Sequence, residues 1–395
     1  MSDPAAVAFA GLRKASPHGE IARVLLAFLA TAGLFYVNIM PALVDGLIQG
    51  AGLSNREAGM VGSSNVYGAA LGALAAVFFV KRINWKKAAY RLLAGLICMD
   101  LLSMLVQRFE PLLAMRFAHG CIGGMLVGIG FAIIARTTQS DRTFGYLLLV
   151  QFGLGGVGLM VLPPLVPTLG TSVLFAALIL FSIVTLLMVP FLTDYPVDSV
   201  RKPVAEAGTA NQRWPLALSL AATFLFQAGN MGVYAYVIGL GEAAGLGMAF
   251  ISPTLAAAAW IGIAGSALVI VLSTRFGRTV PLGVAILLTA AGTWALHFSD
   301  ARLVYIVANC LVGITWAFCI PYLLGMCSEF DKAGQMAALG GFASKMGLAS
   351  GPMIAALVVG TGNYALVVNL GTAALAVSLL AMLLPSRLLD RIAGA

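Results

Sequence analysis

Apolar runs of roughly 20 residues recur along this chain from Ile21 almost to the C-terminus. A helical run of that length crosses the roughly 30 Å hydrocarbon core of a bilayer, since an α-helix rises about 1.5 Å per residue. Only helices account for such runs, because the open edge of a sheet would leave backbone groups unpaired in lipid. Of the 395 residues, 61% are apolar and 10% are charged, a composition that excludes a soluble fold with a charged surface.

Polar, glycine and proline residues divide the apolar sequence into twelve predicted helices. They are expected near residues 21–48, 59–80, 86–107, 111–136, 143–168, 170–193, 213–241, 250–273, 279–297, 302–327, 333–360 and 363–386. The chain is therefore predicted to be an all-α integral membrane protein with twelve transmembrane helices.

The distribution of basic residues predicts how these helices are oriented. With the N-terminus in the cytoplasm, 18 Lys and Arg residues fall in cytoplasmic segments and adjoining helix ends, and three fall in outer loops. Cytoplasmic loops are rich in positive charge, so both termini are predicted to be cytoplasmic in a multi-pass protein of the cell's inner membrane. The net charge of +8 forms no continuous basic patch with interleaved aromatic residues, so we expect no nucleic-acid partner.

Two similar halves joined by a linker are predicted. The longest polar interruption, residues 194–212, is rich in Pro, Ala and charge and lies at the middle of the chain. At an offset near 193 residues, Arg82 aligns with Arg275 and Gln151 with Lys345, in the same order. We therefore expect a cytoplasmic N-terminal tail (1–20), two pseudo-symmetric six-helix bundles (21–193 and 213–386) and a cytoplasmic C-terminal tail (387–395).

The fourth predicted helix carries the most specific motif. Its sequence from Leu113 to Gly124 reads Leu-Ala-Met-Arg-Phe-Ala-His-Gly-Cys-Ile-Gly-Gly. It resembles the Arg-Phe-x-x-Gly pattern of the major facilitator superfamily, with Arg116 and Gly120 at the matching positions, and the resemblance extends from about residue 20 to 386. The resemblance implies two six-helix bundles that rock about a substrate site near the middle of the membrane.

Two predicted cytoplasmic loops are similar to the family's Asp-Arg-x-Gly-Arg motif, which implies gating residues. The second-half loop reads Thr274-Arg-Phe-Gly-Arg278, so Arg275 and Arg278 match the motif while Thr274 replaces its acid. The first-half loop, residues 81–87, keeps Arg82 and lacks both the acid and the glycine. The gate on this side is therefore expected to be held by contacts other than those of the family's acids.

Lys345 lies deep in the predicted eleventh helix. It is about 12 residues from the start of that helix, hence about 18 Å deep, where an unpaired ammonium group costs several kcal/mol. One interpretation is that Lys345 binds an anionic group of the substrate or couples its own deprotonation to transport. The other is a structural pair with an acid or with carbonyl groups at a helix end.

A second set of ionisable residues is predicted in the first half. Arg116 is near the outer end of helix four, within reach of Asp100 on helix three or of Asp45 at the end of helix one. The resemblance implies a role for Arg116 in substrate binding or proton coupling, whereas a fixed bridge to Asp100 would be structural. Asp45, Asp100 and His119 are the candidate proton-coupling residues, although a lone histidine is also compatible with a simple hydrogen bond.

The resemblance implies that helices one, four, seven and ten line the cavity and that helices two, five, eight and eleven form the contact between the halves. An aromatic wall with a few amides suits a small, partly apolar solute. Besides Lys345 and Arg116, the candidate substrate-binding residues are Tyr36, Asn38, Gln151, Gln227, Asn230, Tyr234, Trp260 and Trp316. For each aromatic residue, packing in the core or against lipid is the alternative.

Catalytic functions have little support in the sequence. A membrane enzyme needs acids, histidines or a metal clustered at the membrane surface. His18, His119 and His297 lie far apart, and the five cysteines lack metal-ligand spacing. We therefore expect no metal, no cofactor and no enzymatic activity. A sensor would usually add a long soluble domain, and no such domain is predicted.

We therefore expect a secondary active transporter. The two deep cations, Arg116 and Lys345, favour a small organic anion such as a carboxylate, moved by alternating access in symport with protons. A proton-coupled drug or metabolite exporter is the alternative, although the Gly-x-x-x-Gly-Pro pattern of the family's antiporters is absent from helix five and lies at residues 347–352. A membrane enzyme or a sensor is a further alternative. The expected partners are the solute, protons and the lipid bilayer, with the protein as a monomer.

Overall fold

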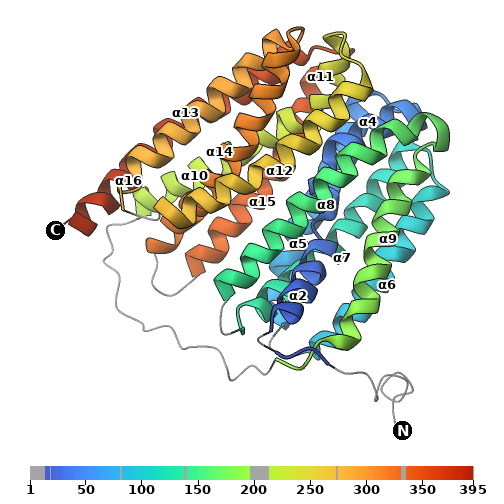
Figure 1. Ribbon diagram of the computed structural model, residues 1–395, viewed down its shortest axis with the longest axis horizontal. Coiled ribbons are helices and arrows are strands. Elements are labelled where there is room, and N and C mark those ends of the chain that lie inside the picture. The colour runs from blue at the N-terminus through green and yellow to red at the C-terminus, as the bar shows by residue number, and fades with distance from the viewer. Residues whose placement is uncertain are drawn as a thin grey trace.

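The computed structural model describes residues 14–17, 19–80, 82–137, 140–195, 213–272, 275–330 and 335–394. These residues form helices and no strand, and the helices make up two bundles that lie side by side (Figure 1). Helices α2 to α9 pack chiefly with one another, as do α10 to α16. Most of the predicted linker at 194–212 and of the predicted N-terminal tail at 1–20 lies outside the described residues.

The first bundle contains the elements up to η1. They are α2 (Glu20–Ala32), α3 (Phe35–Asn38), α4 (Met40–Ala51), α5 (Asn55–Phe79), α6 (Trp85–Met104), α7 (Phe109–Ile134), α8 (Ser140–Leu169), α9 (Ser172–Met188) and the 3₁₀ helix η1 (Val189–Phe191). The second bundle contains α10 (Arg213–Ala235), α11 (Val237–Ala243), α12 (Met248–Leu272), α13 (Thr279–Ala295), the 3₁₀ helix η3 (Leu296–Phe298), α14 (Arg302–Glu329), α15 (Gln335–Val359) and α16 (Tyr364–Gly394).

Within the described residues, ten helices are long and apolar enough to cross a membrane on their own. A further span is α6, a 20-residue helix whose sequence includes the charged residues Lys86, Lys87, Arg91 and Asp100. The last is the series α2, α3 and α4, in which each segment alone is too short to cross. The prediction of an all-α membrane fold with twelve transmembrane helices in two bundles is confirmed.

The prediction of one continuous helix over residues 21–48 is wrong. The chain turns between α3 and α4 at Ile39, where φ is −106° and ψ is 19°. Pro41 follows at the start of α4, and in a continuous helix it would lack the N–H for the Val37 carbonyl and its ring would clash with that carbonyl. The seventh span is broken at Tyr236, between α10 and α11, where φ is −112° and ψ is 9°.

Helix α16 continues through the predicted C-terminal tail at 387–395 as far as Gly394, so the described part of that segment is helical. Leu389 is buried in the second bundle, which extends the apolar face of the helix past the predicted end. The Asp390 carboxylate accepts a hydrogen bond of 3.0 Å from the backbone N–H of Thr279, the first residue of α13. Anionic groups are favoured at helix N-termini, so this contact holds the end of α16 against α13.

Small residues allow the closest helix contacts. A Cβ atom added to Gly124 of α7 would overlap the backbone of Ala69 in α5, and Gly120 approaches α5 in the same way. Gly347 and Gly351 of α15 lie equally close to the backbone of α10. Both pairs have the Gly-x-x-x-Gly spacing that predicts close approach of membrane helices, and the structure confirms that role.

The two ends of the bundles differ in how the halves meet. We call the end at which α2 begins and α16 ends the terminal side, and the opposite end the far side. Helix α5 packs against α15, α8 against α12, and α4 against α10 and α11. Among the described residues, every hydrogen bond between the bundles lies near the midpoint of the helices or closer to the far side.

Candidate functional site

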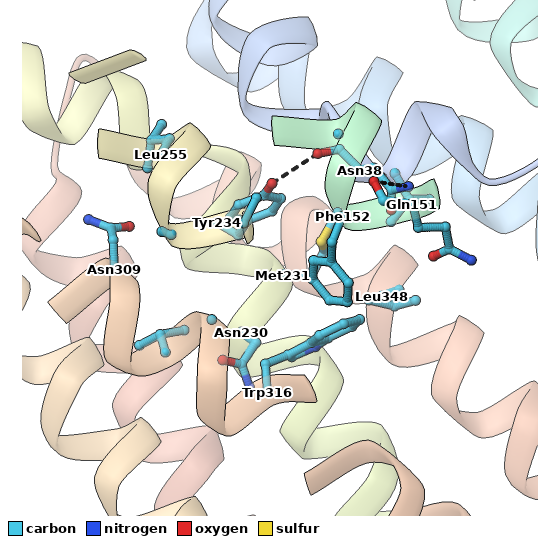
Figure 2. A pocket seen from close by; sticks show the side chains of 16 residues that line it. Asn38, Gln151, Phe152, Asn230, Met231, Tyr234, Leu255, Asn309, Trp316 and Leu348 are labelled. Atoms are coloured by element: carbon cyan, nitrogen blue, oxygen red, sulfur yellow. Dashed lines mark hydrogen bonds between the residues drawn. The ribbon is translucent and has the colours of Figure 1, made fainter. Parts of the chain in front are cut away.

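A cavity of about 120 Å³ lies where the two bundles meet. Both bundles contribute to its lining, which Figure 2 shows from close by: Val37, Asn38, Gln151, Phe152, Gly155, Asn230, Met231, Tyr234, Leu255, Ala258, Ala259, Asn309, Val312, Gly313, Trp316 and Leu348. Apolar and aromatic side chains predominate, with four amides among them. None of these lining residues is charged, so the described walls of the cavity are apolar with dispersed hydrogen-bonding groups.

The breaks in the first and seventh spans position two of the predicted residues. Asn38 is the last residue of α3, and Tyr234 lies two residues before the break at Tyr236. Carbonyl groups at the end of a helix lack partners within it. The Asn38 carbonyl accepts a hydrogen bond of 2.9 Å from the Tyr234 hydroxyl, and Asn38 Nδ2 donates one of 3.3 Å to the Gln151 carbonyl (Figure 2). Asn38 thus connects α3 to α8 and to the second bundle.

Two asparagines on the second bundle have the same local geometry. Asn230 Nδ2 donates a hydrogen bond of 2.8 Å to the Phe226 carbonyl, four residues earlier in α10. Asn309 Nδ2 donates one of 2.8 Å to the Tyr305 carbonyl, four residues earlier in α14. The Oδ1 atom of Asn230 is buried and has no hydrogen-bond partner among the described residues.

Gln227 lies on α10 three residues before Asn230 and orders one wall of the cavity. Its Oε1 accepts a hydrogen bond of 2.8 Å from the Trp316 indole N–H, and its Nε2 donates one of 2.8 Å to the Ser344 hydroxyl. The Gln227 side chain is buried and does not belong to the lining. It therefore positions Trp316, whose ring forms an edge-to-face contact with Phe152 at a centroid distance of 5.8 Å.

Lys345 lies on α15 one helical turn before Leu348, which lines the cavity. Residues three apart share a face of a helix, so Lys345 is next to the cavity on its terminal side. The side chain is half-buried. Among the described residues it has neither a hydrogen bond nor an acidic group within 4.0 Å.

Arg116 lies inside the first bundle, away from the cavity lining. Its guanidinium contacts the Asp100 carboxylate at 2.8 Å, the Met99 carbonyl at 3.0 Å and the Ser103 hydroxyl. It also stacks on the ring of Phe175 at 5.0 Å. The side chains of Arg116 and Asp100 have no exposed surface. The structure thus joins two of the predicted residues in a buried ion pair between α7 and α6.

His119 extends this buried network. Its Nε2 lies 3.3 Å from Asp100 Oδ2, and its Nδ1 lies 2.7 Å from Nδ2 of Asn65. The Asn65 amide can only donate there, so Nδ1 is the acceptor and Nε2 carries the proton toward Asp100. Tyr36 packs beside the His119 ring at a centroid distance of 6.0 Å, and its buried hydroxyl has no partner among the described residues. Neither Tyr36 nor His119 belongs to the cavity lining.

Trp260 lies at the contact between α12 and α8. Its indole N–H donates a hydrogen bond of 3.0 Å to the Gly153 carbonyl, which joins the two bundles near the midpoint of both helices. The side chain is partly exposed and is not part of the lining. The structure therefore places this predicted binding residue at the interface of the bundles.

Asp45 lies at the far side, in a second and smaller pocket between α4, α10 and α11. The Gln49 amide nitrogen lies 3.1 Å from both Asp45 carboxylate oxygens and 3.3 Å from both carboxylate oxygens of Glu242. Asp45 is buried, whereas Gln49 and Glu242 are exposed. One amide thus connects an acid of each bundle.

The predicted gating arginines lie at the terminal side. Arg278 pairs with Glu329 at 2.7 Å, which joins the start of α13 to the end of α14 within the second bundle. The guanidinium of Arg275 lies 5.9 Å from the centre of the Phe276 ring, and Arg82 is exposed. Among the described residues, none of the three arginines forms an ion pair or hydrogen bond with the opposite bundle; Thr274 lies outside this part of the chain.

Sequence reasoning missed several residues of these pockets. Asn309 is an intramembrane amide, the same signal that singled out Asn230, and it was not included. Phe152 follows the predicted Gln151 directly in the sequence. Gln49 and Glu242 lie at the outer ends of the first and seventh predicted helices. Polar residues are expected there, so their presence does not indicate a site. Among the described residues, no three acids, histidines or cysteines come together as a metal site would require.

Twelve helices in two bundles around a shared cavity define a polytopic membrane transporter. The chain belongs to the Major Facilitator Superfamily, whose family model matches residues 24–356. Its fold is similar to the crystal structure of the nucleoside transporter NupG, with a TM-score of 0.71 and 12% sequence identity over 92% of this chain and 98% of that one. It is also similar to the human organic anion transporter MFSD10 (TETRAN), with a TM-score of 0.64 and 16% identity over 93% and 100% of the two chains. No curated protein matches the sequence.

Proposed function

We propose that this protein is a secondary active transporter that moves a small organic anion, a carboxylate, by alternating access in symport with protons. The observation that carries the proposal is Lys345, a half-buried cation without an acidic partner among the described residues, one turn from the cavity lining. An unpaired charge at membrane depth is costly, so a negative group of the solute would stabilise it. The apolar and aromatic walls suit the remainder of such a solute.

The alternating-access part of the proposal is supported by the distribution of contacts between the bundles. Hydrogen bonds join the bundles only near the midpoint of the helices or closer to the far side, among the described residues. We assign this arrangement to the state that is open toward the terminal side. That side faces the cytoplasm in the topology we propose, in which both termini are cytoplasmic and a monomer is embedded in the inner membrane.

Asp45 is the best-placed candidate for proton coupling. Asp100 is paired with Arg116 and contacts His119 inside one bundle, whereas Asp45 is linked through Gln49 to Glu242 of the other bundle. A proton on Asp45 removes its negative charge at the contact between the bundles. This contact must open before the solute can reach the site from the far side. Occupancy by a proton is thereby linked to the balance between the two states.

The proposal is tested by the thermal stability of the purified protein in detergent with a panel of carboxylates, sugars, amino acids and lipophilic cations. A ligand that binds only the folded state raises the melting temperature. A carboxylate is expected to stabilise the parent, and Lys345→Gln is expected to bind it about 10- to 100-fold more weakly, since a hydrogen bond to a charged group contributes about 1.5–3 kcal/mol. Lys345→Arg should retain part of the affinity.

Lys86→Gln is the matched control, because Lys86 pairs with Asp194 at 2.9 Å on the terminal side, away from the cavity. It should bind the carboxylate as the parent does. Equal stabilisation of the parent and Lys345→Gln by a carboxylate would remove Lys345 from the site. If lipophilic cations alone stabilise both proteins, the anion proposal fails and the exporter interpretation takes its place.

A further inference from the structure

The orientation of the two cavity asparagines is determined by their neighbours. A backbone carbonyl can only accept a hydrogen bond, so Asn230 must turn its Nδ2 toward the Phe226 carbonyl and Asn309 its Nδ2 toward the Tyr305 carbonyl. In each side chain Oδ1 then points away from the helix backbone. In the view of Figure 2 the oxygen of Asn309 is on the right of its side chain, below Leu255, and the oxygen of Asn230 is on the left of its side chain, next to Trp316.

The other hydrogen-bonding groups of this wall have already used their polar hydrogens. Tyr234 donates its hydroxyl hydrogen to the Asn38 carbonyl, and Trp316 donates its indole hydrogen to Gln227. Each of these side chains has only one such hydrogen. The wall formed by α10 and α14 therefore presents acceptors to a solute, and the buried Oδ1 of Asn230 has no partner among the described residues.

A buried acceptor without a donor is unfavourable, so a solute that supplies a donor is preferred over one that does not. We propose that the transported solute carries a hydroxyl or N–H group at the end opposite its anionic group, and that this donor binds Oδ1 of Asn230 or of Asn309. The anionic end rests on the proposed function, while the donor end follows from the two amides alone.

The positions of these residues along their helices give the solute a direction. Asn309 comes seven residues after Arg302, at the far-side start of α14, hence about 10 Å from that end. Lys345 comes ten residues after Gln335, at the terminal-side start of α15, hence about 15 Å from the opposite end. The donor group is therefore directed to the far side, and the anionic group to the terminal side.

Matched aromatic probes test the donor end. The purified full-length protein is titrated with 4-hydroxyphenylacetate, 4-methoxyphenylacetate and phenylacetate, and with the three corresponding neutral amides. The methoxy compound keeps the oxygen and loses the donor. We expect the hydroxy compound to bind the parent about two- to tenfold more tightly than either analogue, the range of one net hydrogen bond.

The preference should fall to near onefold in Asn309→Leu or in Asn230→Leu, whichever removes the acceptor that the donor binds; both replace the amide at similar side-chain size. Asn369→Leu is the control, because Asn369 is an exposed amide that contacts His297 at 2.8 Å, outside the cavity. Melting temperatures without ligand report whether each variant folds. Asn309 is only half-buried, so its variant is the one to use if Asn230→Leu is unstable.

The two series separate this inference from the proposed function. A hydroxy preference among the neutral amides, lost in at least one of the asparagine variants, supports the donor end even if no carboxylate binds, in which case only the anionic end fails. If the carboxylates bind without a hydroxy preference, or if the preference survives in both variants, the donor assignment is overturned and the anionic end stands. Binding of none of the six probes to the parent overturns both.

Discussion

The Tyr234 hydroxyl donates a hydrogen bond of 2.9 Å to the backbone carbonyl of Asn38, across the contact between the two bundles. Both residues lie next to a break in their transmembrane span and both line the cavity. The bond therefore closes the cavity wall and holds the bundles together at the same point. In the proposed alternating-access mechanism, a change in this bond would alter the balance between the two states as well as the site.

Tyr234→Phe removes this bond and leaves the ring in place. A hydrogen bond contributes about 0.5–1.5 kcal/mol net, so the state joined at the far side should lose about two- to tenfold in population relative to the alternative state. Spin labels or fluorophores on the terminal side of the two bundles measure that balance, and the distance between them should shorten in the variant.

Tyr305→Phe is the matched control. The Tyr305 hydroxyl also donates to a backbone carbonyl, that of Val237 at 3.0 Å, but both residues belong to the second bundle. This variant should lower the melting temperature and leave the distance between the labels unchanged. An equal shift of the label distance in both variants would show that the Tyr234 bond has no specific part in the balance.

Asp45→Asn should separate exchange of the solute from its coupling to protons. The asparagine keeps a hydrogen-bonding group beside Gln49 and carries no titrating carboxyl. In proteoliposomes we expect exchange of internal for external solute to continue, while accumulation driven by a pH gradient is lost. Glu57→Gln is the control, since Glu57 is a far-side acid that caps α5 through Ser54. Full pH-driven accumulation by Asp45→Asn would exclude Asp45 as the coupling residue.

The fold was predictable from the sequence because its strongest determinants are local. A run of about 20 apolar residues can cross lipid only as a helix, and the excess of basic residues in alternate loops predicts which way each helix crosses the membrane. The break in the first span was missed although Pro41 indicates it. A proline at this point of a long apolar run is compatible with either a kinked helix or a full break. No proline lies at the break near Tyr236, so that break depends on tertiary packing.

The site was predictable only in part, because it depends on the rotation of each helix. Intramembrane amides and aromatic residues were recognised by their type, and Asn38, Gln151, Asn230, Tyr234 and Trp316 line one cavity. Gln227 and Trp260 have the same character and lie outside the lining, in contacts between helices. The sequence has no signal for that difference. The roles of Gln227 and Trp260 in binding stay predictions.

Gly124→Ala should destabilise the protein through a single added methyl group. The new Cβ would overlap the backbone of Ala69, which cannot move aside as a side chain can, so the cost should be about 1–3 kcal/mol. Gly145→Ala is the same change in α8 at a position where the added Cβ would meet no atom within 4 Å beyond the neighbouring backbone of its own helix, and there it should be neutral or stabilising by up to about 1 kcal/mol. Melting temperatures in detergent compare the two, and equal values would contradict the close contact of α5 and α7.

The buried pair of Arg116 and Asp100 offers a test between a structural and a transport role for Arg116. Removing one partner of a buried ion pair leaves an uncompensated charge, so Asp100→Asn and Arg116→Met should each cost about 3–5 kcal/mol. Apolar replacement of both partners removes both charges, so the double variant Arg116→Met with Asp100→Leu should recover most of the lost stability.

Melting temperature and transport must both be measured on these variants. If the pair is structural, the stable double variant should transport at close to the parent's rate, because neither side chain reaches the cavity lining. If Arg116 takes part in transport, as the motif on its helix implies, the double variant should be stable and inactive. Single variants that keep the parent's melting temperature would contradict the buried pair itself. A charge without surface exposure is compensated only by its partner and by the groups that bond to it.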